Sequence, residues 1–108
     1  MRELTQPSRD EITFVEVLHA LADPARLQIV AHLADGRRES CSGINEGMDV
    51  HQTTMSHHYR VLREAGLTWT TIEGRSRYVT LRRADLDARF PGFLAGVLTQ
   101  LPEPARPS

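Results

Sequence analysis

One stretch of this chain decides its fold, and it reads QTTMSHHYRVLREAGL from Gln52 to Leu67. Its apolar residues Met55, Tyr59 and Leu62 recur at intervals of four and three, which is typical of the buried face of a helix. Gly66 follows where the end of a helix commonly needs a left-handed residue. The stretch therefore predicts a helix over residues 52–64 with one buried face.

The opposite face of this predicted helix is polar. Its side chains can hydrogen-bond to phosphates and base edges, and they are Gln52, Thr53, Thr54, Ser56, His57, Arg60 and Arg63. The first five lie near the helix N-terminus, which is the end that contacts bases in many DNA-binding helices. We therefore expect base contacts from them, and phosphate contacts from Arg60 and Arg63.

A short β-hairpin is predicted directly after the helix. Strand-type residues (Trp69, Thr71, Tyr78, Val79 and Leu81) flank the turn Glu73-Gly74-Arg75-Ser76. Arg75 and Arg77 at its tip are expected to touch the minor groove or its backbone. Trp69 and Tyr78 are interpreted as wing anchors or core residues, with packing favoured for Trp69. A helix suited to a DNA groove and a basic hairpin together indicate a winged helix-turn-helix, so DNA binding is the leading function.

Composition and charge are compatible with that function. The 108 residues, 40% hydrophobic and 25% charged, predict one globular domain, and a single cysteine fits a reducing cytosol. No apolar run approaches the roughly 20 residues needed to span a bilayer, and the N-terminus does not resemble a signal peptide, so we expect a cytoplasmic protein. The net charge is −1, but residues 51–83 hold six arginines against two glutamates. The positive charge is concentrated where phosphate contacts are predicted.

The N-terminal half is expected to form three helices after a flexible segment over residues 1–9. Asp10 is the predicted cap of a first helix that ends near Leu21, with Ile12, Val15 and Leu18 on its apolar side and Phe14 as a further candidate. Asp23 and Pro24 are expected to open a second helix that ends near Asp35-Gly36, with core residues Leu27, Ile29, Val30 and Leu33. A short third helix is predicted over residues 43–48.

The C-terminal part is expected to contain a helical turn over residues 82–89 and a last helix over residues 92–101. That last helix is apolar around much of its circumference, so we expect it to pack on a partner, most simply its own copy. The predicted domain spans residues 10–101, and Pro102, Pro104 and Pro107 predict a disordered tail over residues 102–108.

Two motifs in this order resemble the ArsR/SmtB family of bacterial transcriptional regulators. They are LHALADPARLQI over residues 18–29 and TMSHHYRVLREAGL over residues 54–67, and the wing EGRSRY over residues 73–78 is similar too. The resemblance covers roughly residues 12–100. It implies a mostly α winged helix-turn-helix with the order α-α-α-α-β-β-α. It also implies a homodimer through the first and last helices that binds a palindromic operator, and most members release DNA when a metal ion or another inducer binds.

The two metal sites of the family that we considered are absent from this sequence. One is built around Cys-x-Cys, but here the corresponding segment is Glu39-Ser40-Cys41-Ser42-Gly43, and one thiolate cannot hold a soft metal ion. The other uses histidines on the last helix, and no histidine follows position 58. Cys41 without a visible resolving thiol is more simply read as inert.

Glu16 and His19 are the remaining candidate metal ligands. They lie three residues apart, hence on one face of the first helix, and a twofold dimer would bring two such pairs together. Nitrogen and oxygen donors suit Ni(II) or Zn(II), although a solvated helix face is the favoured reading. His57 and His58 are adjacent and point to different sides, which argues against a shared metal. His58 is expected to be structural or phosphate-directed.

Two functional hypotheses follow from the sequence. The first is a dimeric, sequence-specific DNA-binding transcriptional regulator. The alternative is a winged-helix interaction module or co-regulator that depends on a separate sensor protein. Catalysis is not expected, because Ser56 beside His57 is a chance pair on a helix with no accompanying motif.

Overall fold

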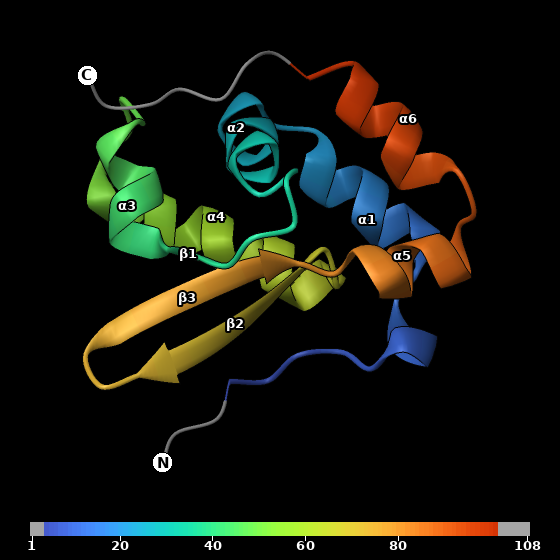
Figure 1. The fold of residues 1–108 in the computed structure, drawn as a ribbon, viewed down its shortest axis with the longest axis horizontal. Helices are drawn as coiled ribbons and strands as arrows, with labels where there is room; N and C mark the ends of the chain where they lie inside the picture. The colour runs from blue at the N-terminus through green and yellow to red at the C-terminus, as the bar shows by residue number, and fades with distance from the viewer. Residues whose placement is uncertain (1–3, 102–108) are drawn as a thin grey trace.

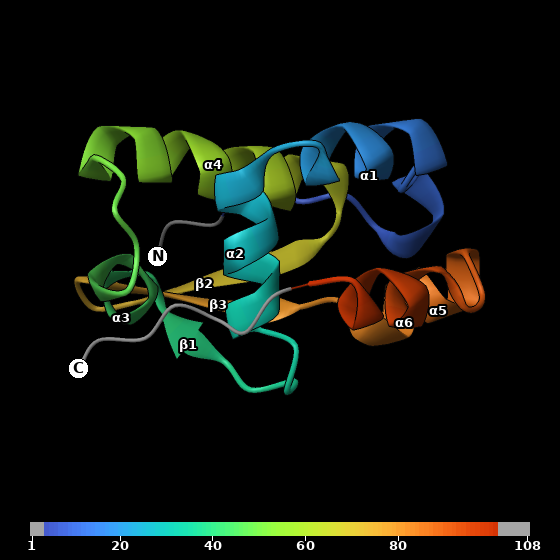
Figure 2. The same cartoon turned by 90° about the horizontal axis from the view of Figure 1, so that it is seen from above.

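Residues 4–101 are described by the structure, which is a computed structural model; residues 1–3 and the predicted tail over 102–108 lie outside the described range. The elements in chain order are a 3₁₀ turn (Arg9–Glu11), α1 (Phe14–Leu21), α2 (Pro24–His32), β1 (Glu39–Ser40), α3 (Cys41–Glu46), α4 (Gln52–Ala65), β2 (Thr68–Glu73), β3 (Ser76–Leu81), α5 (Arg83–Arg89) and α6 (Phe93–Thr99). Figure 1 shows a helical body from which the β2–β3 hairpin projects. In the view of Figure 2, α4 and α1 lie along the upper part of the molecule, the hairpin and α5 lie below them, and α2 runs between the two levels.

Capping side chains decide where the first two helices begin. Thr13 caps α1 by accepting a hydrogen bond from the first turn, so the prediction of Asp10 as the cap was wrong. Asp10 lies instead in the separate 3₁₀ turn. Asp23 caps α2 through two backbone N–H groups with Pro24 at the first helical position, as predicted.

The segment between α2 and α4 contains a strand that the sequence did not predict. β1 pairs antiparallel with β3 through Glu39 and Ser40, giving a three-stranded sheet of order β1-β3-β2. Ser40 also caps α3, because its Oγ accepts a hydrogen bond from Gly43 N at 3.0 Å. The third helix therefore begins at Cys41, two residues before the predicted start.

The predicted helix and hairpin at the centre of the chain are confirmed. α4 ends at Gly66, which has φ 89° and forms the left-handed C-cap. Glycine is required there for a second reason, because a Cβ atom at this position would lie 2.5 Å from Ile12 Cγ1. β2 and β3 pair along their whole length, from Thr68 opposite Leu81 to Glu73 opposite Ser76.

Two helices follow the hairpin. α5 corresponds to the predicted helical turn, whereas α6 is shorter than the predicted helix over residues 92–101. The winged helix-turn-helix class is confirmed, and the predicted order is extended by β1 and by the separate α5. None of the helices within residues 4–101 has the length and apolar character needed to cross a membrane.

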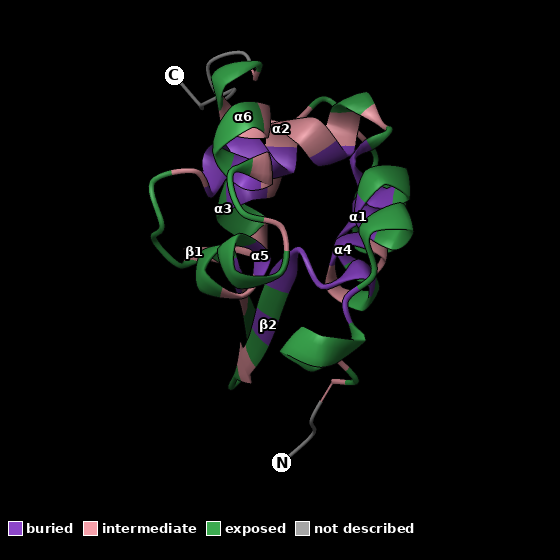
Figure 3. Ribbon diagram, turned by 90° about the vertical axis from the view of Figure 1, so that its right-hand side faces the viewer, coloured by how far each residue is buried: buried purple, intermediate pink, exposed green. Residues whose placement is uncertain are grey.

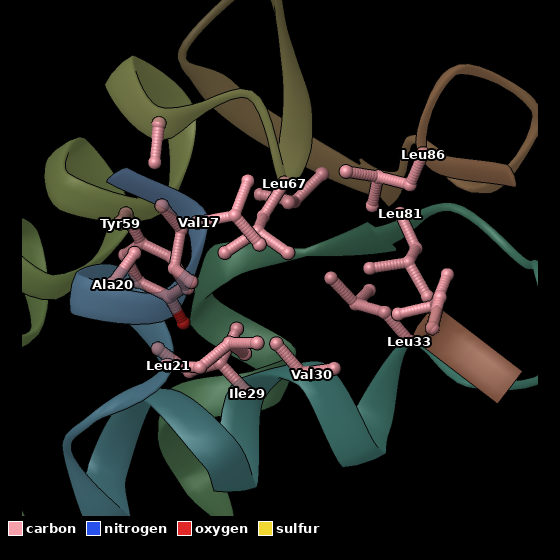
Figure 4. Close-up of a cluster of buried hydrophobic side chains, with 14 of the residues drawn as sticks. Val17, Ala20, Leu21, Ile29, Val30, Leu33, Tyr59, Leu67, Leu81 and Leu86 are labelled. Atoms are coloured by element: carbon pink, nitrogen blue, oxygen red, sulfur yellow. The ribbon is translucent and has the colours of Figure 1, made fainter. Parts of the chain in front are cut away.

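The core lies where α1, α2 and α4 meet the base of the hairpin. In Figure 4, side chains including Val17, Ile29 and Leu67 point towards one another from these elements. On α1 the buried residues differ from the prediction, because Val15 and Leu18 are 76% and 45% exposed. Figure 3 shows the corresponding exposed outer side of α1. Apolar periodicity identified the stripe, but it does not distinguish a buried face from an exposed one.

The segment before α1 packs against the sheet, although residues 1–9 were expected to be flexible. Gln6 Nε2 donates to Thr70 O at 3.0 Å, and Thr70 N donates to Gln6 Oε1 at 2.7 Å. Arg82 Nη1 donates to Pro7 O at 2.6 Å. The Gln6 carboxamide thus satisfies backbone groups on the free edge of β2, as a neighbouring strand would.

Candidate nucleic-acid interface

The polar face of α4 is open to solvent. Met55, Tyr59 and Leu62 are buried on the opposite face as predicted, so the helix is held with its polar side outward. Of the seven side chains predicted to contact DNA from this helix, six are exposed and Arg63 is half-buried; the exposed ones are Gln52, Thr53, Thr54, Ser56, His57 and Arg60. The structure therefore brings these residues together on one accessible surface.

The N-terminus of α4 is fixed by a residue that the sequence analysis missed. His51 is the N-cap, and its Nδ1 accepts a hydrogen bond from Thr53 N at 3.3 Å. Histidine is not among the common capping residues, so the pattern gave little signal. Ser56 Oγ donates to Gln52 O at 3.3 Å, and Arg60 Nη2 lies 3.3 Å from His57 Nδ1. Ser56 and His57 thus have separate hydrogen-bond partners on the helix.

Arg38 braces the wing, here defined as β2, β3 and their turn. Its guanidinium forms an ion pair with Glu73 and lies 3.9 Å from the centre of the Tyr78 ring. The exposed Arg75 and Arg77 project from the turn and from β3. Arg38 lies between α2 and β1, and nothing in its local sequence indicates the ion pair with Glu73, 35 positions later.

Trp69 packs as the favoured interpretation predicted, and of its two alternatives the structure shows the wing anchor instead of the core residue. It is 42% exposed, and its ring packs under the guanidinium of Arg82 at 5.1 Å. Arg82 is itself buried and binds Asp85 and the Pro7 carbonyl. Trp69 therefore anchors the base of the wing from outside the core.

His58 belongs to a buried polar cluster that joins α4 to α1 and α2. Arg26 Nη1 donates to His58 Nδ1 at 3.2 Å, and Arg26 Nε donates to Ala20 O at 2.6 Å. Asp23 lies 3.9 Å from the other ring nitrogen. Burial lowers the pKa of His58, and Arg26 and His57 lower it further against the opposing effect of Asp23. The structure places His58 in a structural position and away from the exposed face.

A groove of about 500 Å³ separates α3 and α4 from the wing. On its α3 side, Tyr59 donates to Asn45 Oδ1 at 2.7 Å and to Cys41 O at 3.2 Å. Burial raises the pKa of the Cys41 thiol to about 11, partly opposed by Arg77. A thiol with this pKa is almost wholly protonated near neutral pH, which agrees with the expectation of an inert cysteine.

Glu16 and His19, the candidate metal ligands, are exposed on α1. With Glu64 of α4 they line a shallow hollow of about 440 Å³ whose remaining lining residues are apolar. Within residues 4–101, no three histidine, cysteine, aspartate or glutamate side chains are arranged to hold a metal ion. Glu16 and His19 therefore have no third candidate ligand beside them among the described residues.

The helices α2 and α3, the exposed polar face of α4 and the wing together define a winged helix-turn-helix protein. A model described as a helix-turn-helix domain matches residues 21–68. The uncharacterized HTH-type transcriptional regulator YceK of Bacillus subtilis (strain 168) is 37% identical over 92 residues, which are 84% of this chain and 92% of that protein. The chain belongs to the ArsR/SmtB family of transcriptional regulators.

Solved structures of several transcriptional regulators share the fold of this chain. HlyU from Vibrio cholerae N16961 superposes with a TM-score of 0.64 at 29% identity, covering 80% of this chain and 91% of that one. A possible transcriptional regulator for arsenical resistance gives a TM-score of 0.60 at 29% identity, covering 82% and 98% of the two chains. An ArsR-like regulator from Rhodococcus sp. RHA1 gives 0.60 at 25% identity, covering 76% and 78%.

Proposed function

We propose that this regulator binds a palindromic operator as a homodimer, with α4 in the major groove and the wing beside it. The observation that carries the proposal is the exposed polar face of α4, held outward by its buried opposite face and flanked by the arginines of the wing. Gln52, Thr53, Thr54, Ser56 and His57 would read base edges. Arg60, Arg63, Arg75 and Arg77 would contact the backbone.

An apolar surface formed by α1 and the C-terminal helices supports the homodimer. Phe14 is 42% exposed, and its ring packs 5.1 Å from Phe90 and 5.0 Å from Phe93. Val15 and Leu18 continue the same surface along α1. Exposed apolar residues that adjoin in this way favour burial against a second copy, and a twofold axis would present two α4 helices to two half-sites.

A binding assay on the DNA upstream of the protein's own gene tests the proposal. We expect purified protein to elute as a dimer in light-scattering chromatography. We also expect it to bind one palindrome whose half-sites lie about one helical turn, roughly 34 Å, apart. A monomer that binds no upstream sequence would contradict the proposal. Tight binding only after addition of a second protein would favour the alternative. In that alternative, the chain is a co-regulator that depends on a separate sensor protein in the same cytoplasm.

We further propose that this regulator responds to Ni(II) or Zn(II). Glu16 and His19 lie on the α1 face that the proposed dimer would use, so a second copy could add the missing ligands. Calorimetric titration of the purified protein with Ni(II) and Zn(II) is expected to show near-stoichiometric binding that is lost in His19→Ala. Unchanged metal affinity in that variant would remove these residues from consideration.

A further inference from the structure

The groove between α4 and the wing gathers positive charge without an acidic counterpart. Arg63 of α4 and Arg75 and Arg77 of the wing line it, and among its described lining residues there is no aspartate or glutamate. None of the ion pairs found in residues 4–101 involves these three arginines, whereas Arg9, Arg38 and Arg82 are all paired. The groove is therefore a concentrated positive site on a chain of net charge −1.

Two polar groups in the groove are buried without a hydrogen-bond partner. The Thr70 side chain is on the groove side of β2, its residue is only 5% exposed, and its Oγ1 has no hydrogen-bond partner within residues 4–101. Arg63 Nε is buried and unpartnered in the same way. Buried polar groups are nearly always satisfied in folded proteins, so this donor and this hydroxyl are groups that an ordered water or a ligand with acceptor oxygens would satisfy.

The electrostatics of Arg63 support the same conclusion. Burial lowers the pKa of its guanidinium, and Arg77 and Arg60 lower it further, while Glu64 alone among the neighbouring charges raises it. A bound anion would relieve both the repulsion and the loss of hydration. A planar guanidinium binds tetrahedral oxyanions through two parallel hydrogen bonds, which makes phosphate a better match than a halide.

We propose that this groove is a preformed phosphate-binding site in which Arg63, Arg77 and Thr70 hold a phosphate group. Ser56 and Gln52 of α4 also line the groove. The phosphate comes either from the operator backbone, which rests on the proposed function, or from a free anion in solution.

Titration of the DNA-free protein with inorganic phosphate tests the site itself. In two-dimensional amide NMR, we expect saturable shifts at groove residues that sodium chloride at equal ionic strength does not produce. Arg63→Gln should weaken phosphate binding at least tenfold and Thr70→Val about threefold, while Arg83→Gln, an exposed arginine of α5 outside the groove, should match the wild type. Phosphate shifts no larger than those of chloride, or equal affinity in Arg63→Gln and the wild type, would overturn the proposal.

Thr70→Val keeps the test decisive if Arg63→Gln does not fold, because valine has nearly the shape of threonine and lacks only the hydroxyl. In that case, unchanged phosphate affinity in a folded Thr70→Val variant would overturn the site. Thermal unfolding of each variant, without phosphate, provides the check on folding.

Competition with DNA identifies the source of the phosphate. At constant ionic strength, phosphate should weaken operator binding by the wild type about fivefold and have no phosphate-specific effect on Arg63→Gln. If phosphate binds saturably but leaves operator binding unchanged, the operator backbone is not the source of the phosphate group. The free anion is then the ligand of the groove. Failure of all DNA binding would count against the proposed function only, because the phosphate titration requires no DNA.

Discussion

His58 Nδ1 accepts a hydrogen bond from Arg26 Nη1 across 3.2 Å, inside the junction of α1, α2 and α4. The acceptor nitrogen must be unprotonated, so the contact requires the neutral imidazole. The same arginine binds the last turn of α1 through the Ala20 carbonyl. The orientation of α4 relative to the body of the domain thus depends on a titratable side chain.

Stability should therefore fall in acid through His58. Because the pKa of His58 is lowered in the folded state from an ordinary value of 6.5, the unfolded chain binds more protons below about pH 6.5. The contribution of His58 is complete above that pH and is lost as the pH falls towards the folded-state pKa. Urea unfolding between pH 7.5 and 5 measures this loss.

The variant His58→Asn isolates this effect, because the Asn carbonyl can still accept from Arg26 but does not titrate. We expect its unfolding free energy to change less over the same pH range. His19→Asn, at an exposed position of α1, should keep the wild-type profile. A His58→Asn profile identical to that of the wild type would show that His58 does not carry the acid sensitivity.

Arg26→Met should destabilise the protein by about 3 kcal/mol, because it leaves the Ala20 carbonyl and His58 Nδ1 without donors in a buried place. Arg37→Met is the matched control, since that side chain is 83% exposed. Chemical denaturation of both variants measures the difference. A loss of stability no larger than in Arg37→Met would mean that the buried contacts contribute little.

Gln6→Ala should cost about 1 kcal/mol and speed hydrogen exchange at the Thr70 amide, because the two bonds to the edge of β2 disappear. Gln100→Ala, at the exposed end of α6, is the control. Exchange at Thr70 that does not differ between the two variants would show that Gln6 does not protect the edge.

Cys41 should react slowly with iodoacetamide. With a pKa of about 11, only about one thiol in a thousand is ionised at pH 8, against roughly a quarter for an ordinary free cysteine. We expect alkylation of the folded protein to be about a hundredfold slower than that of the urea-unfolded chain. Equal rates would mean that the thiol is not shielded by the fold.

Local patterns predicted some parts of this structure and long-range contacts decided the others. The period of Met55, Tyr59 and Leu62 and the glycine at position 66 identified α4 because both signals are local. β1 was missed because two residues carry no periodicity, and it exists through pairing with β3. The exposed apolar face of α1 was mistaken for a core face, because apolar periodicity is the same for both.

The contacts that support the site could not be predicted from local sequence patterns, because they join residues far apart in the chain. The bond between Gln6 and Thr70 spans 64 residues, and the one between Arg26 and His58 spans 32. Each partner looks unremarkable in its own segment. The polar residues of α4 were predictable as a surface, whereas the groove they share with the wing depends on the way the hairpin folds back beside α4.

The salt dependence of operator binding in two single variants measures whether the N-terminal part of α4 reads bases while the wing contacts phosphate. Arg75→Ala should weaken binding to all sequences and reduce the slope of log affinity against log salt by about one per protomer. Gln52→Ala should leave that slope unchanged and relax discrimination at one position of each half-site, by about 1–3 kcal/mol. Unchanged slope in Arg75→Ala together with unchanged discrimination in Gln52→Ala would contradict the account.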